Sequence, residues 1–306
     1  MKYQCVLLCM HGMGRLEKGD FIQEIAQLKR TLGERIGSEA LANIYVPPEG
    51  IYYSDITQRS EDKVWSSMET QGGLNTGLIR RHTINRMRRF ILSGFSDATA
   101  FISNQSFDQF QPYKEVQMRI HTALEQVRQE CGDEVPVVVL SHSLGCQIFS
   151  NYLWDAQRYM RERRQGLPLQ VSSKSVWHGR EAGELDRFLS LQTLRAWVST
   201  GCNIPVFVSG FQNVSAVQTQ AEGYDFTWHN YFDYDDVLGY PLAPLGCLYQ
   251  GQASPHGQSY VTAVKDIQVN AYSGFWGALF ASWNPLSHTQ YWQDKEVIDG
   301  LAAFLK

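Results

Sequence analysis

The sequence predicts an α/β protein in which helices flank a mostly parallel sheet. Near-continuous apolar runs, QCVLLCM at 4–10 and VPVVVL at 135–140, are typical of strands buried on both faces. Segments with helical spacing separate such runs, as between 113 and 127. Strands that alternate with helices form parallel sheets covered on both sides.

The remaining elements are predicted from apolar spacing and from capping residues. Asp20 is a candidate N-cap, with Gln23 three residues later, and Gly33 a candidate stop. The expected strands lie at 4–10, 43–48, 135–140, 204–209, 226–232 and 266–274, and the expected helices at 20–33, 84–95, 113–131, 148–156 and 297–305.

The composition indicates one large globular domain over residues 1–306. Apolar residues make up 43% of the chain and charged residues 19%. A net charge of −4 gives no electrostatic reason to expect nucleic acid as a partner. No apolar run reaches the roughly 18 residues of a spanning helix, so we expect no integral membrane segment.

The first residues have the charge and apolar run of a short signal peptide, but no small-residue cleavage site follows. We therefore interpret them as a strand. The six cysteines form no CxxC pair, which favours buried reduced thiols and a cytoplasmic protein. The oligomeric state is not predicted.

The segment SHSLG, 141–145, joins a predicted strand to a predicted helix. A nucleophile at such a turn needs small residues two positions away on each side, because strand and helix come close together. Centred on Ser143, those neighbours are Ser141 and Gly145. Centred on Ser141, one neighbour would be Val139, which is too bulky. The pattern therefore selects Ser143, and the side chain of His142 should point away from it.

The segment HGMG, 11–14, ends the first predicted strand. His11, Gly12 and Gly14 allow a sharp turn that presents backbone N–H groups. The N–H of Met13 is a candidate donor to an oxyanion, together with that of Leu144 at the start of a helix. A tight turn without function is the alternative. The spacing does not fit the nucleotide-binding glycine patterns.

A serine nucleophile needs a base and an acid that orients the base. His288 follows the last predicted strand through a loop and is the preferred base. Asp235 follows the preceding predicted strand and is the preferred acid, with Asp236 a close rival and Asp233 a weaker one. Clustered aspartates also cap turns. Their spacing departs from a calcium-binding loop, so no metal site is predicted.

Taken together, 10–14, 141–145, the aspartates and His288 resemble the α/β-hydrolase fold, in particular its lipase- and esterase-like members. The resemblance implies a triad of Ser143, Asp235 and His288, with an oxyanion hole from Met13 and Leu144. It also implies a sheet shortened at its N-terminal side, since two strands of the family have no room here. Segments 51–111 and 157–200 are candidate helical lids.

The expected activity is hydrolysis of a small-molecule carboxylic ester, or of another acyl compound, without a cofactor. A thioesterase, a peptidase or an acyltransferase would use the same residues. A non-catalytic binding protein with this fold is the alternative from another class, because a fold does not determine a function.

Overall fold

The computed structural model describes residues 2–14, 16–74, 84–102, 111–181, 183, 186–210, 216–245, 263–270 and 291–306. Its centre is a six-stranded sheet in the order β2-β1-β3-β4-β7-β8. All neighbouring strands in it are parallel. The strands are β1 Cys5–Met10, β2 Ile44–Tyr45, β3 Val137–His142, β4 Leu194–Thr200, β7 Thr227–Phe232 and β8 Val264–Gln268. The α/β class predicted from the sequence is confirmed.

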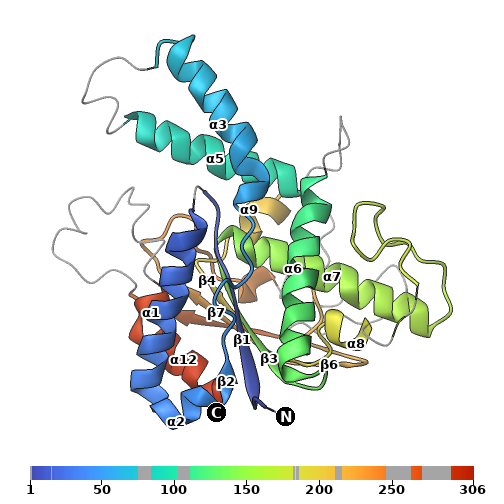
Figure 1. The fold of residues 1–306 in the computed structure, drawn as a ribbon. Coiled ribbons are helices and arrows are strands. Elements are labelled where there is room, and N and C mark those ends of the chain that lie inside the picture. The colour runs from blue at the N-terminus through green and yellow to red at the C-terminus, as the bar shows by residue number, and fades with distance from the viewer. Residues whose placement is uncertain are drawn as a thin grey trace.

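Helices cover both faces of this sheet (Figure 1). One face carries α1 and α12, and the other carries α6 and α7. Short elements complete these layers, and β5 and β6 form a separate antiparallel hairpin. The bounds are α1 Lys18–Ile36, α2 Ser38–Ala42, α6 Pro112–Cys131, α7 Leu144–Arg164, α8 Asp186–Leu189, α9 Ile204–Val208, α12 Lys295–Leu305, β5 Gln220–Ala221, β6 Tyr224–Asp225 and the 3₁₀ helix η3 Tyr291–Gln293.

The apolar strands divide their side chains between two cores. In β3, Val137 and Val139 face the core with α6 and α7, whereas Val138 and Leu140 face the core with α1 and α12. This alternation follows from the period of two along a strand. A strand buried on both faces must be apolar at every position, which explains the continuous apolar runs in the sequence.

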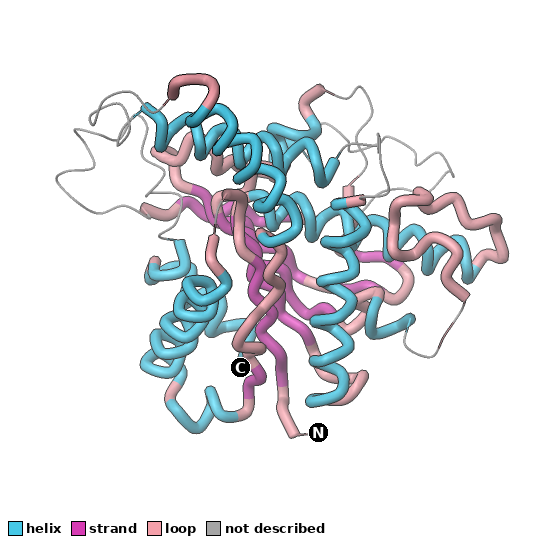
Figure 2. The backbone as a smooth tube through the Cα atoms, turned by 45° about the horizontal axis from the view of Figure 1, so that its top comes forward, coloured by secondary structure: helices cyan, strands magenta, loops and turns pink. Residues whose placement is uncertain are grey.

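Two further helices, α3 Asp55–Thr70 and α5 Ile84–Ile102, lie outside the two layers. They pack against each other beyond the end of the sheet at which β1 finishes (Figures 1 and 2). Both belong to the candidate lid segment 51–111. They are therefore at the edge of the sheet where the loops after β1 and β3 emerge.

Two predictions about secondary structure are wrong. Residues 204–208 form helix α9 rather than a strand, with Pro205 in its first turn, where a missing N–H costs nothing. The strand next to β3 is instead β4, which begins at Leu194 and lies inside the candidate lid 157–200. Residues 157–164 are likewise the end of α7. Residues 157–164 and 194–200 therefore belong to the helical layer and to the sheet, so they are not part of an inserted lid.

The strand β4 escaped prediction because it carries polar residues. The Oγ of Ser199 donates to Asn230 Oδ1 at 2.9 Å, and the Oγ1 of Thr200 donates to the Ser141 carbonyl at 3.1 Å. Groups on neighbouring strands thus accept the hydrogen bonds of these hydroxyls. In the sequence alone, the two residues only shorten an apolar run. Among the described residues, no helix combines the length and apolar character needed to cross a membrane.

Candidate active site

Four loops meet at the carboxyl edge of the sheet. They follow β1 at His11, β3 at Ser143, β4 at Gly201 and β7 at Asp233. Because the strands are parallel and adjacent, all four loops emerge on the same side. The sheet therefore brings together chain segments that lie up to about 220 residues apart in sequence.

Ser143 joins β3 directly to α7. Its backbone angles are φ 51° and ψ −124°, in a region that favours glycine. Its N–H donates to the Thr200 carbonyl at 3.0 Å, which holds the turn against β4. Its hydroxyl is buried and has no hydrogen-bond partner in the part of the chain that the structure describes. Backbone strain and an unpartnered buried hydroxyl both cost free energy, and both recur at functional sites.

Two glycines let the loop after β1 touch this turn. A Cβ on Gly12 would lie 2.8 Å from the Cβ of Ser143. A Cβ on Gly145 would lie 2.3 Å from the carbonyl oxygen of His11. Both distances are shorter than carbon and oxygen atoms tolerate, so only glycine fits at either position. The sequence prediction that residue 145 must be small is explained by this contact.

Ser141 has a structural role. Its Oγ accepts a hydrogen bond from Trp197 Nε1 at 2.8 Å and donates to Cys146 Sγ at 3.2 Å. Nδ1 of His142 lies 3.1 Å from the Thr200 carbonyl. The ring of His142 is thus directed towards β4, as the sequence predicts for the residue before Ser143.

His11 braces the loop after β1. Its Nε2 accepts from the N–H of Tyr53 at 3.1 Å, so the proton of the neutral ring is on Nδ1, which donates to the Gly12 carbonyl at 2.7 Å. The ring stacks on that of Tyr53 with centroids 4.0 Å apart. Burial lowers the pKa of His11 to about 4, so the ring stays neutral at pH 7. Because both ring nitrogens are hydrogen-bonded, His11 is suited to holding this loop in place rather than to transferring a proton.

The two candidate oxyanion donors belong to the loops that meet at Gly12 and Ser143. Met13 follows Gly12, and Leu144 is the first residue of α7. Neither N–H donates to a backbone carbonyl within the described residues. The N–H of Leu144 also lies at the positive end of a helix of 21 residues, where negative charge is stabilised.

The three aspartates after β7 have different surroundings. Asp235 is exposed, whereas Asp233 and Asp236 are buried. Oδ2 of Asp236 accepts from the Tyr291 hydroxyl at 2.9 Å, and Oδ1 accepts from the Leu238 N–H at 2.9 Å. Oδ1 of Asp233 accepts from the Asp235 N–H at 2.9 Å, which is a turn-capping contact.

Asp236 also lies close to the end of β3. A Cβ on Gly201, after β4, would be 3.1 Å from Asp236 Oδ2 and 3.1 Å from Cε1 of His142. The carboxylate and the residue before Ser143 therefore approach the same point. Burial, followed by the charge of Asp236, raises the pKa of Tyr291, which keeps this phenol protonated as the donor.

Helix α5 contributes an acid to the loop after β1. Oδ2 of Asp97 accepts from the Gly14 N–H at 3.2 Å, and Oδ1 accepts from the Thr57 Oγ1 at 2.5 Å. The hydroxyl of Ser54 donates to the Gly14 carbonyl at 3.3 Å. Burial, and then the nearby Glu61, raise the pKa of Asp97 to about 8. The helices of the 51–111 segment thus hold the loop that carries Met13.

His288 lies outside the described residues. Among the described residues, no cluster of three or more His, Cys, Asp or Glu side chains could hold a metal ion. Of the predicted site residues that the structure describes, Ser143, the loop from His11 to Gly14 and the three aspartates all lie at one edge of the sheet.

Sequence reasoning missed Tyr291 and Asp97. Tyr291 offers a weak signal, because it follows His288 by three residues in a loop before the last helix. Asp97 offers none, since an aspartate within an amphipathic helix is normally solvated. Only the packing of α5 on the loop after β1 shows its role.

Comparison with protein-family models found no match for this chain. A search of curated proteins also found no significant similarity.

Proposed function

We propose that the protein is a serine hydrolase of the α/β-hydrolase fold, lipase- or esterase-like, with Ser143 as the nucleophile. The observation that carries this proposal is the backbone of Ser143. A serine with positive φ, placed between a buried strand and a helix, has the geometry of a nucleophile elbow. Its unpartnered buried hydroxyl supports the same role.

The order of the parts along the chain supports the proposal. The loop with Met13 comes first, then Ser143, then the aspartates after β7, and last His288 between β8 and α12. This is the order serine, acid, histidine of one hydrolase architecture. The parallel sheet order also sets the strand with the oxyanion loop, β1, directly beside the elbow strand β3.

We assign the acid to Asp236 in preference to Asp235. An acid that orients a histidine works best when it is buried and held by hydrogen bonds, since its own geometry is then fixed. Asp236 meets both conditions through Tyr291 and Leu238, whereas Asp235 is exposed. Asp233 is buried but is engaged in capping its own turn.

His288 is the proposed base. It precedes Tyr291, whose hydroxyl donates to Asp236, by three positions. A chain of three residues spans at most about 11 Å. A segment this short would allow His288 to reach the carboxylate to which Tyr291 donates.

The proposed reaction is acyl transfer to water. His288 takes the proton of Ser143 while Oγ bonds to the acyl carbon, and the carbonyl electron pair moves to oxygen. The N–H groups of Met13 and Leu144 stabilise that oxyanion, each by about 3 kcal/mol. The intermediate collapses, and the leaving group departs with the proton from His288. Water repeats the sequence and frees Ser143.

We propose that α3 and α5 form a cap over the site. They lie beyond the carboxyl edge of the sheet and bind the loop after β1 through Asp97 and Ser54. Ser143 is fully buried, so a substrate reaches it only when covering residues move. The stretch 157–200 does not contribute a cap at the residues that form α7 and β4.

Covalent labelling tests the nucleophile. A fluorophosphonate probe should label the folded protein, and Ser143→Ala should abolish the labelling. Ser38→Ala is the matched control, because Ser38 is exposed at the start of α2, on the chain segment that leads into β2, and should leave labelling unchanged. Folded wild-type protein that resists the probe would instead favour a binding protein.

A substrate panel then defines the class of acyl compound. We expect short-chain carboxylic esters to turn over faster than thioesters or peptides, with water as the acceptor. Faster cleavage of peptides, or transfer to an added alcohol in place of water, would move the protein to the peptidase or acyltransferase class.

The acid is tested by two amide variants. Asp236→Asn should lower kcat by about 10⁴, because the orientation of the imidazole is lost, and Asp235→Asn should have little effect. Equal melting temperatures of the two variants would show that folding is not the cause. A larger loss in Asp235→Asn would return the assignment to that residue.

A further inference from the structure

A pocket lies far from the candidate active site, at the other end of α7. It has a volume of about 340 Å³ and is formed by the C-terminal half of α7 and the β5–β6 hairpin. Arg161 lines it and follows Leu144 by 17 residues. A helix of that length rises about 25 Å, so this pocket is separate from the Ser143 site.

Positive charge is concentrated on one side of this pocket. Arg158, Arg161 and Arg164 line it from successive turns of α7, and Glu222 is the only acidic residue in its lining. Side chains three positions apart share a helix face. The pocket therefore has an excess of guanidinium groups over carboxylates.

These arginines differ in how their charge is used. Arg158 is paired at 2.8 Å with the buried carboxylate of Glu162. Arg164 donates to the Glu222 carbonyl, and its Nε lies 3.9 Å from the carboxylate of Glu222, which is 83% exposed. Arg161 has no ion pair or side-chain hydrogen bond with any residue that the structure describes. Its planar set of donors is thus available.

A second donor in the lining also lacks an acceptor. Nε2 of Gln218 is buried and has no hydrogen-bond partner among the described residues. The backbone of Gln218 is held in place, because its N–H donates to Gln157 Oε1 at 2.8 Å and its carbonyl accepts from Gln157 Nε2 at 2.7 Å. A buried amide donor on a fixed backbone is normally satisfied, so the missing acceptor is informative.

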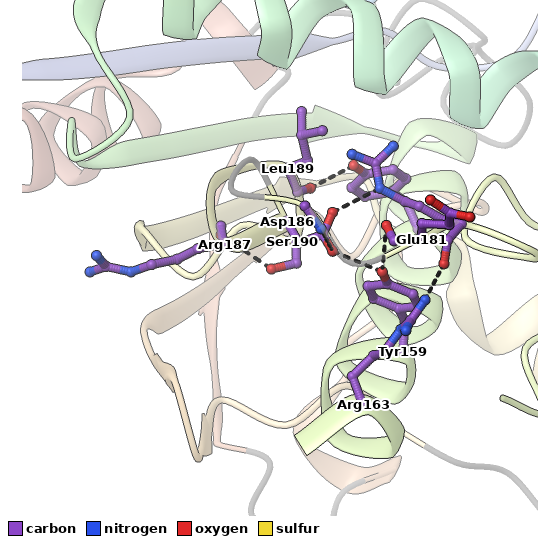
Figure 3. Close-up of polar contacts among 10 residues, drawn as sticks. Tyr159, Arg163, Glu181, Asp186, Arg187, Leu189 and Ser190 are labelled. Carbon is purple, nitrogen blue, oxygen red and sulfur yellow. Dashed lines mark hydrogen bonds and ion pairs between the residues drawn. The ribbon is translucent and has the colours of Figure 1, made fainter. Parts of the chain in front are cut away.

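Tyr159 and Arg163, which lie on the same helix outside this lining, have polar groups that are hydrogen-bonded to other protein groups (Figure 3). Arg163 donates to the Arg180 carbonyl and lies over the ring of Tyr159, 5.3 Å from its centroid. The hydroxyl of Tyr159 and the Nε of Arg180 both donate to Asp186, each at 2.8 Å. In that network the donors have protein acceptors, whereas the guanidinium of Arg161 and Nε2 of Gln218 have none among the described residues.

We propose that this pocket binds a small organic anion in which a phosphate or carboxylate is attached to a planar ring. An anion supplies the acceptors that Arg161 and Gln218 lack, and guanidinium binds such groups with two parallel hydrogen bonds. Trp154 and Tyr224 line the same pocket and provide aromatic surface for a ring. The volume falls in the range of small-molecule sites. The proposal does not depend on hydrolase activity.

Calorimetric titration of the full chain tests this proposal. Phenyl phosphate and benzoate are the aromatic probes, and inorganic phosphate and cyclohexyl phosphate are the probes without a planar ring. We expect one aromatic anion to bind at one site, more tightly than either probe without a ring. The tighter of phenyl phosphate and benzoate identifies the anionic group.

Two charge variants make the test specific. Arg161→Gln should weaken binding at least about tenfold, since it removes the charge-assisted hydrogen bonds. It should leave the melting temperature unchanged, because Arg161 makes no side-chain bond in the described structure. Arg30→Gln removes an exposed arginine of α1 and should change neither quantity. Gln218→Ala should weaken binding by a smaller factor.

Two results would overturn the proposal. One is the absence of binding by phenyl phosphate and benzoate at millimolar concentration to folded wild-type protein. The other is equal affinity in wild-type and Arg161→Gln. Equal binding of phenyl phosphate and cyclohexyl phosphate would reject the aromatic part of the ligand.

Discussion

The central sheet and the helical pair α3–α5 are built from opposite kinds of side chain. In β1 every residue is apolar and buried. In the pair, the buried positions include Glu61, Ser93 and Asp97. Large apolar residues of the pair are meanwhile exposed to solvent, namely Val64, Met68, Ile84, Ile91 and Phe95. The sheet has an ordinary core, whereas the pair buries acids and exposes apolar surface.

The difference predicts different responses to solution conditions. Apolar burial does not depend on pH, so the sheet should be insensitive to it. A buried carboxyl group is protonated or charged according to pH, so the pair should respond. A region held by few apolar contacts also opens at lower free energy than the core. We therefore expect α3 and α5 to open at a lower free energy than the sheet.

The largest expected effect is in the sheet. Leu8→Ala removes a fully buried side chain that lies opposite Val139 in the register of β1 and β3. It should lower the free energy of unfolding by about 3–5 kcal/mol, because it leaves a cavity between packed layers. Urea unfolding measures this loss. A loss below 1 kcal/mol would show that the sheet is not tightly packed.

The junction between the sheet and the site should be nearly as sensitive. Gly145→Ala places a methyl group 2.3 Å from the His11 carbonyl oxygen. The strain should cost about 1–3 kcal/mol. It should also slow fluorophosphonate labelling of Ser143, because the loop after β1 is displaced. Gly210→Ala is the control, since a Cβ there meets no atom within 4 Å.

A smaller, pH-dependent effect is expected in the helical pair. The pKa of Asp97 rises from 3.8 to about 8 through burial and through Glu61. The folded state then binds more protons than the unfolded state between these values. Stability from this group is present below pH 4 and is lost as pH rises towards 8, by at most about 1.4 kcal/mol per pH unit.

Asp97→Asn should remove this slope. Thermal melts from pH 4 to 8 should show a steeper decline for wild-type protein than for the variant. Asp62→Asn is the control, because Asp62 is on α3 but its carboxylate is partly exposed and paired with Arg89. Parallel curves for wild type and Asp97→Asn would contradict the assignment of the slope to Asp97.

The smallest effect concerns the exposed apolar surface of α5. Phe95 is 69% exposed, whereas Phe101 on the same helix is 1% exposed. Phe95→Ser should change stability by less than about 0.5 kcal/mol, and Phe101→Ser should cost at least about 3 kcal/mol. Similar losses in the two variants would mean that Phe95 is covered in solution, which would weaken the contrast between the pair and the sheet.

Much of the fold could be predicted from local pattern. The strands β1 and β3 are apolar throughout, so their runs stand out, and α1 and α6 have clear helical spacing. The strand β4 could not be found in this way, since its last two residues, Ser199 and Thr200, shorten its apolar run. Their partners belong to β3 and β7, which no local pattern can reveal.

The candidate site divides in the same way. The turn at Ser143 and the need for a glycine at 145 could be predicted, because the spacing of small residues around such a turn is a local requirement. The choice among three aspartates could not, since Asp235 and Asp236 are neighbours with the same chemistry. Their difference arises from burial and from the hydrogen bond that Tyr291 donates across the fold.

The sequence alone determined the class of fold, the position of Ser143 in the turn between β3 and α7, and the glycine-rich loop after β1. Each follows from constraints between residues close together in the chain, such as period, turn geometry and lack of space for a Cβ. The tertiary structure decided which of the neighbouring Asp235 and Asp236 is buried, and how Asp97 binds the loop after β1. It also decided that the side chains of Arg161 and Gln218 line a pocket in which neither has an acceptor among the described residues. These features depend on contacts between distant segments, because burial and hydrogen-bond partners exist only once the chain is packed.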